Sequence, residues 1–158
     1  MASTTLTQKQ GFTIVELLIV IVVIGILAAI TVVAFNGVQQ RSRVERANSD
    51  ITTLNKAIHL ARISTGRTLY SITGSNCTRC STDPDRYELT LDRISAASGA
   101  NLDSLKAGDP WGDDYSIDEN EGEGSTPEAQ CATRDILHVI NGSNKSGVRS
   151  VYVPFYNC

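Results

Sequence analysis

The apolar residues of this chain are concentrated in one uninterrupted tract near the start of the sequence. From Leu17 to Phe35 no side chain is charged, and Thr31 is the only polar residue. Nineteen residues in an α-helix rise about 28 Å, close to the thickness of the hydrocarbon core of a bilayer. A helix in the core of a soluble protein would carry a polar face, and this tract has none. The pattern therefore predicts a membrane-spanning helix.

The residues that follow change to an amphipathic helical pattern. Apolar side chains recur at steps of three and four, the spacing of one buried helical stripe: Val44, Ala47, Ile51, Leu54, Ile58 and Ala61. The basic side chains of this stretch are expected on the other faces: Arg41, Arg43, Arg46, Lys56 and Arg62. Gly66 is expected to end the helix, because glycine tolerates the left-handed cap conformation. A coiled coil is the alternative, but the stripe lasts less than four heptads and includes two alanines.

The last third of the chain carries short strand patterns. Strands are predicted within Tyr115–Asp118, Thr133–Ile140 and Val148–Phe155, with a turn at Asn141-Gly142 between the last two. Of residues 68–110 the pattern predicts only a turn at Asp83-Pro84 and a short helix near 102–106. We expect an α+β fold in which the second half of a long helix packs on a small antiparallel sheet.

Composition and charge argue against some classes of function. The chain has 158 residues, 14 Lys and Arg against 17 Asp and Glu, and a formal net charge of −3. This mildly acidic balance argues against binding nucleic acid through overall charge. His59 falls within the amphipathic helix and His138 within an apolar strand, and no nucleophile or metal motif accompanies either. We therefore expect a protein that is not an enzyme.

The four cysteines, Cys77, Cys80, Cys131 and Cys158, all lie after the apolar tract. An even number outside the membrane favours disulfides, for which three connectivities are possible. We expect Cys77–Cys80 and Cys131–Cys158, the second joining the final strand to the sheet. A zinc site would need a second closely spaced pair.

One carboxylate lies at the start of the apolar tract. Glu16 would cost about 2–3 kcal/mol in a membrane helix even on lenient insertion scales, so it usually needs a partner. It could lie shallow and reach the headgroups. Alternatively, cleavage between Gly11 and Phe12 would create an ammonium on Phe12, four residues before Glu16 on the same helix face, or equally close in a staggered neighbouring chain.

The run from Gly11 to Glu16, with the apolar residues 17–30 that follow, resembles the prepilin signature of the type IV pilins and pseudopilins. The similarity covers about residues 9–35 and rests on Gly, then Phe, then Glu five residues after the Gly, leading an apolar helix. The sequence departs from many members at Val33, where they have a proline that kinks the helix. Only Asn36-Gly37 would weaken the helix there.

The resemblance implies a chain of four segments: a leader (1–11), a membrane and filament-core helix (12–37), an amphipathic half of the helix (38–66), and a head (67–158). A prepilin peptidase would cut after Gly11 and methylate the Phe12 amine, and Glu16 would neutralise that amine in a neighbouring subunit. The chain would be a single-pass cytoplasmic membrane protein before assembly. Afterwards, with the membrane platform of the assembly machinery, it would enter an extracellular homopolymer, in which residues 131–158 would form an exposed disulfide-bounded region.

An acidic run follows Asp109-Pro110-Trp111-Gly112, which resembles an element of major pseudopilins. In those proteins a calcium loop follows. The candidate ligands here are Asp113, Asp114, Asp118, Glu119, Glu121 and Glu123. A solvated acidic loop without metal is the reading we favour, since no EF-hand spacing is present.

The sequence thus favours a structural subunit of a type IV pilus-like filament serving adhesion, motility or DNA uptake. One alternative is the major pseudopilin of a type II secretion system, which the acidic loop favours. Another is a membrane-anchored binding domain that never polymerises, although a simple anchor has no need of Glu16.

Overall fold

The computed structural model describes residues 11–74, 77–140 and 145–158, and the chain divides into two units, residues 1–39 and 40–158. Apart from Gly11, the expected leader lies outside the described residues, and so does the expected turn at Asn141-Gly142.

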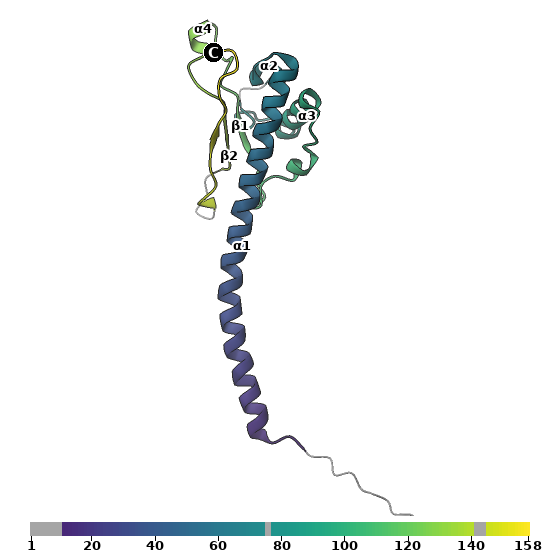
Figure 1. The fold of residues 1–158 in the computed structure, drawn as a ribbon, viewed down its shortest axis with the longest axis vertical. Coiled ribbons are helices and arrows are strands. Elements are labelled where there is room, and N and C mark those ends of the chain that lie inside the picture. Colours follow the sequence, from purple (N-terminus) through teal and green to yellow (C-terminus); the bar gives the residue numbers. More distant parts are fainter. Residues whose placement is uncertain (1–10, 75–76, 141–144) are drawn as a thin grey trace, which may run out of the picture. The chain divides into compact units, whose positions relative to one another are not determined.

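The first unit contains the apolar part of helix α1, which spans Ile14–Thr65 (Figure 1). The helix continues without interruption through Val33, Asn36 and Gly37, because no proline removes a backbone donor there. Within the described residues, α1 is the one helix that is long and apolar enough to cross a membrane. Its apolar side chains from Phe12 to Val38 are exposed in the isolated chain. This confirms the expected long apolar helix.

The second unit contains the rest of α1, whose buried face is the predicted stripe. All but the first of the predicted positions are buried, and Val44 is half-buried. The helix ends at Gly66, which has φ of 68° and donates its backbone N–H to the Arg62 carbonyl oxygen at 2.8 Å. The prediction for Arg62 was wrong: this side chain is buried, with only 1% of its surface exposed.

The second unit also contains short helices. They are α2 (Leu69–Thr73), α3 (Arg86–Ser98), the 3-10 helix η1 (Asp103–Ala107) and α4 (Pro127–Gln130). The short helix expected near 102–106 is η1, whereas α2 and α3 add structure that the pattern does not predict. The core-facing residues of α3 are Tyr87, Thr90, Leu91 and Ile94.

The sheet has three antiparallel strands in the order β1-β2-β3. These are β1 (Ser116–Asp118), β2 (Ile136–His138) and β3 (Val151–Tyr152). The expected strands are found, but they are shorter than the predicted ranges. Pro154 has no backbone N–H to extend β3, and the last backbone bond of this ladder runs from Val153 N to Asp135 O at 2.9 Å.

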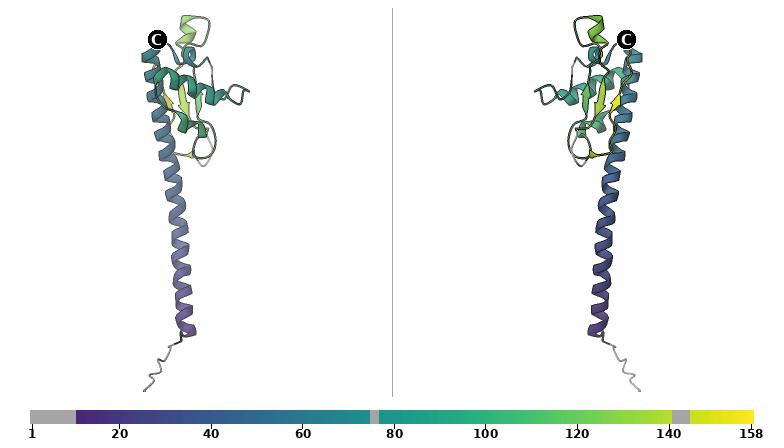
Figure 2. Two further views of the ribbon diagram at one scale, coloured as in Figure 1. Left: turned by 90° about the vertical axis from the view of Figure 1, so that its right-hand side faces the viewer. Right: turned by 90° about the vertical axis from the view of Figure 1, so that its left-hand side faces the viewer.

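One core joins the sheet to the second half of α1, and both views in Figure 2 show the strands lying along this part of the helix. Leu54 and Ile58 of α1 pack in the same cluster as Ile117 and Leu137 of the sheet. The observed architecture is therefore the expected α+β fold, and it places the last turn of α1 beside the C-terminal end of the chain.

Candidate functional site

The start of α1 carries the residues of the predicted processing site. Phe12 is 86% exposed, and Thr13 caps the helix. The Thr13 N–H and hydroxyl both donate to Oε2 of Glu16, at 2.8 and 2.7 Å, while the Glu16 N–H donates to Thr13 Oγ1 at 3.3 Å. This reciprocal pattern is a capping box, in which two helix-end donors are satisfied. The Glu16 carboxylate is therefore hydrogen-bonded to Thr13, the residue directly after Phe12.

The cysteines form two disulfides with the expected pairing. Cys77–Cys80 has a Cα–Cα distance of 5.1 Å, and Cys131–Cys158 one of 5.6 Å. The first closes a turn that is attached to β1, because Thr78 N donates to the Ile117 carbonyl oxygen at 2.9 Å. The second joins the end of α4 to the last residue of the chain.

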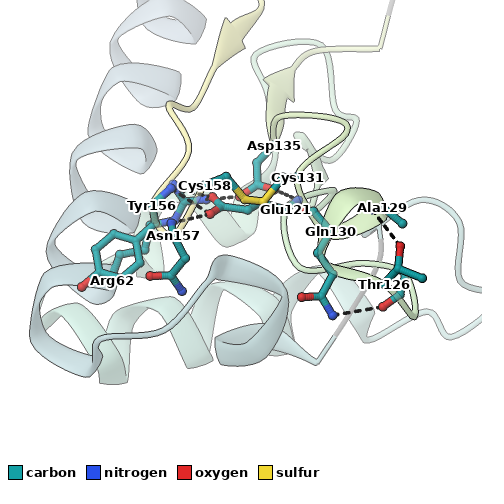
Figure 3. The surroundings of a disulfide bond; sticks show 11 residues. Arg62, Glu121, Thr126, Ala129, Gln130, Cys131, Asp135, Tyr156, Asn157 and Cys158 are labelled. Atoms are coloured by element: carbon teal, nitrogen blue, oxygen red, sulfur yellow. Dashed lines mark hydrogen bonds and ion pairs between the residues drawn. A yellow bond between two sulfur atoms is a disulfide. The ribbon is translucent and has the colours of Figure 1, made fainter.

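A buried charge cluster lies next to the second disulfide (Figure 3). Nη2 of Arg62 donates to Oδ2 of Asp135 and lies 3.3 Å from Oε2 of Glu121. Its Nη1 donates to the Pro154 carbonyl oxygen at 2.7 Å. All three charged side chains are at most 1% exposed. Burial raises the pKa of Asp135, and the bonds from Glu121 N and the charge of Arg62 oppose that rise.

The carboxylate of Glu121 holds the C-terminal residues. It accepts the N–H of Tyr156 at 2.8 Å and the N–H of Asn157 at 2.7 Å. The Glu121 N–H in turn donates to Oδ1 of Asp135 at 2.7 Å. The last residues of the chain are thus tied to α1 and to the start of β2 through side-chain charges.

A second charged cluster organises the loop at Asp109–Gly112. Nζ of Lys145 lies 2.7 Å from a carboxylate oxygen of Asp109 and 2.7 Å from one of Asp113, and 5.6 Å from the centre of the Trp111 ring. The other Asp109 oxygen accepts the N–H of Trp111 at 2.9 Å and that of Asp113 at 3.1 Å. The hydrogen bond and charge of Lys145 hold the pKa of the Asp113 carboxyl below its usual range.

The structure does not bring the six calcium candidates together. Asp113 pairs with Lys145, Glu121 faces Arg62, and Glu119 is buried on its own after β1. Within residues 11–74, 77–140 and 145–158, no three His, Cys, Asp or Glu side chains converge as a metal site would require. The cation that neutralises Asp109 and Asp113 is an ammonium of the chain itself.

Sequence reasoning missed Arg62, Asp135 and Lys145. Arg62 follows Ile58 by four residues, so its position on the buried stripe could have been read from the spacing. Asp135 and Lys145 carried no such signal, since their partners are 14 to 73 residues away in the chain.

The family model described as "Prokaryotic N-terminal methylation motif" matches residues 6–32. The chain is 30% identical to the type II secretion system core protein G of Escherichia coli strain K12 over 139 residues, 82% of this chain and 90% of that protein. It is 29% identical to core protein G of Vibrio cholerae, over 68% of this chain and 69% of that protein. A fimbrial protein of Pseudomonas aeruginosa is 42% identical over 53 residues, 34% of each chain.

No solved structure matches this chain. Three findings support the same family: the methylation motif, the long apolar helix, and the similarity over nine-tenths of core protein G. The chain belongs to the type IV pilin and pseudopilin family and is a membrane-anchored, pilin-like filament subunit.

Proposed function

We propose that this chain is cut between Gly11 and Phe12 and then polymerises through the apolar half of α1. The observation that carries this proposal is the exposure of that helix half on every side, with Glu16 as its only carboxylate. A bilayer covers such a surface before assembly, and the helices of neighbouring copies cover it in a filament. The role is structural; a prepilin peptidase and a membrane assembly platform supply the covalent and mechanical steps.

Glu16 selects the register of the packed helices. A carboxylate among apolar helices is costly unless a cation meets it. Cleavage creates an ammonium on Phe12, next to Thr13, whose N–H and hydroxyl already bind the Glu16 carboxylate in the uncut chain. A neighbouring copy that is shifted along the helix axis presents the same ammonium to Glu16. Neutralisation between copies therefore favours one axial offset over the others.

The test is Glu16→Ala in the full chain. Membrane insertion should be unchanged, because the apolar tract is intact, whereas the yield of filaments sheared from cells should fall at least about tenfold, the effect of about 1.4 kcal/mol per added subunit. Glu45→Ala, which removes an exposed carboxylate from the same helix, is the matched control. Wild-type filament yield from Glu16→Ala would contradict the pairing.

Two kinds of filament each have an observation in their favour. Similarity to core protein G covers 90% of that protein, which favours a secretion-type pseudopilus. The 42% identity to fimbrial proteins over 53 residues, together with two disulfides in the head, favours a surface pilus used in adhesion, motility or DNA uptake.

Mass spectrometry of sheared surface material and of the membrane fraction separates these two. A chain that begins at methylated Phe12 and is abundant in sheared filaments indicates the pilus. The same mature chain confined to the membrane fraction indicates the pseudopilus. A chain that retains Met1 or Ala2 in both fractions would refute processing at Gly11.

A further inference from the structure

Two adjacent residues after β1 contact both arms of the Cys131–Cys158 disulfide. The Gly122 N–H donates to the carbonyl oxygen of Gln130 at 3.0 Å, directly before Cys131. The Glu121 carboxylate accepts the N–H groups of Tyr156 and Asn157, directly before Cys158 (Figure 3). Residues 121–122 thus bind the two chain segments at the positions that precede the two sulfur atoms.

These contacts do not involve the sulfur atoms. The Glu121 side chain is buried, and hydrogen bonds from N–H groups to a carboxylate are about twice as strong as those to a neutral acceptor. Arg62 compensates its charge, and the Glu121 N–H is fixed by Asp135. None of these partners is a cysteine side chain, so reduction of the disulfide removes none of them.

The Arg62 guanidinium also binds the segment that precedes Cys158. Its Nη1 donates to the Pro154 carbonyl oxygen at 2.7 Å, four residues before the end of the chain. In the segment 154–157, one backbone carbonyl group therefore binds Arg62 of α1, and two backbone N–H groups bind Glu121. A segment held at both its N–H and its C=O groups has a defined direction as well as a defined place.

We infer that Glu121-Gly122 is a template that aligns Cys158 with Cys131 before they are oxidised, with Arg62 as the positioning cation. The substrate is the folded dithiol, and the oxidant is a disulfide, either in a thiol oxidase protein or in glutathione. One cysteine thiolate attacks the oxidant and releases one thiol. The second thiolate then attacks the mixed disulfide and releases the second thiol, so two protons and two electrons leave the chain.

Ordering of this kind appears as a high effective concentration of one thiol near the other. A flexible loop alone gives effective concentrations in the millimolar range, and here 27 residues separate the cysteines. The template raises this value because the tail is already docked. Cys77 and Cys80 are only three residues apart, and no hydrogen bond joins either to Glu121 within the described residues, so we expect their pairing to be independent of Glu121.

The test is the equilibrium of the full chain, in detergent, with mixtures of reduced and oxidised glutathione. Glu121→Gln should lower the effective concentration for Cys131–Cys158 at least about tenfold, the effect expected from weakening one charged hydrogen bond. The Cys77–Cys80 value should not change in the same molecules. Glu128→Gln, which changes an exposed carboxylate of α4, should leave both values at wild type. Equal values for wild type and Glu121→Gln would overturn the template.

A second variant keeps the inference testable if Glu121→Gln fails to fold. In Cys131→Ser/Cys158→Ser, the backbone N–H groups of Tyr156 and Asn157 should remain protected from hydrogen exchange, within about tenfold of wild type. Loss of protection in Cys131→Ser/Cys158→Ser alone would show that the disulfide positions the tail, and would overturn the inference.

Discussion

Lys145 occupies the place among acidic side chains where a bound cation would otherwise be expected. Its ammonium contacts Asp109, Asp113 and the face of Trp111. Asp109 is buried, so its charge has little access to water. The loop conformation also depends on Gly108, because a Cβ there would lie 2.7 Å from the backbone oxygen of Asp113. A single lysine therefore holds a loop that is otherwise dominated by acidic residues.

Lys145→Met should lower the free energy of unfolding by about 3 kcal/mol, because it leaves the buried Asp109 carboxylate without its cation. Trp111, the only tryptophan of the chain, reports the loss by fluorescence during chemical denaturation. Lys56→Met removes an exposed ammonium from α1 and serves as the control. Equal stability of the two variants would contradict a structural role for Lys145.

Glu119 is a buried carboxyl without an evident partner. Within the described residues neither of its oxygens accepts or donates a hydrogen bond, and the Thr73 hydroxyl that faces it donates to the Leu69 carbonyl oxygen at 3.0 Å instead. Burial, together with smaller contributions from the charges of Asp135 and Asp118, raises the pKa of Glu119 to about 8. The neutral acid is therefore the form that the fold favours at pH 7.

The stability of the head should fall as the pH rises between about 4.5 and 8. In this window the unfolded chain releases the Glu119 proton and the folded chain retains it, so the loss is at most about 1.4 kcal/mol per pH unit. Glu119→Gln should remove this slope, as measured by denaturation midpoints at a series of pH values. An unchanged slope in Glu119→Gln, relative to the Glu128→Gln control, would assign the pH dependence to other groups.

At the scale of elements, α1 has two halves with different surroundings. Side chains of the first half are exposed in the isolated chain, whereas the stripe of the second half lies in the head core. Leu54→Ala should therefore cost about 2–5 kcal/mol of head stability by removing buried methyl groups and leaving a cavity. Thr53→Ala, on the exposed face of the same turn, should cost less than about 0.5 kcal/mol. Similar unfolding free energies for both would mean that the stripe does not stabilise the head.

The sequence predicts α1 well because its two signals are local. An uninterrupted apolar tract and a stripe at steps of three and four need no knowledge of the rest of the fold, and Gly66 ends the helix as expected. The strands were located but their lengths were not, since a ladder of two or three residues depends on neighbours far along the chain. The capping box at Thr13 was likewise present in the sequence as Thr and Glu three residues apart.

The partners of the buried charges are what the sequence could not reveal. Arg62 was expected in solvent, because an arginine on an amphipathic helix is usually exposed. Its carboxylate partners, Glu121 and Asp135, are 59 and 73 residues further along the chain, and only the fold brings them together. Glu121 was a calcium candidate by composition alone, whereas its oxygens bind backbone N–H groups and face Arg62.

At the scale of the whole head, Arg62→Leu should lower the free energy of unfolding by about 3–5 kcal/mol, because two buried carboxylates lose their cation. Arg43→Leu, an exposed position on α1, is the control. The charge of Arg62 lowers the pKa of Asp135, so without the guanidinium Asp135 takes up a proton at higher pH, and acidification should recover part of the loss. Stability of Arg62→Leu that does not rise relative to wild type as the pH falls would contradict this account.

The hydrogen bond from Arg62 to the Pro154 carbonyl oxygen joins two residues that are 92 positions apart in the chain. In the proposed filament, tension would pass along the packed helices to the last turn of α1, which is hydrogen-bonded to the segment that contains Pro154. A pull on the helix thus reaches the chain end through one guanidinium instead of through the intervening backbone. Separating the last turn of α1 from this segment should therefore require several charged contacts to break together.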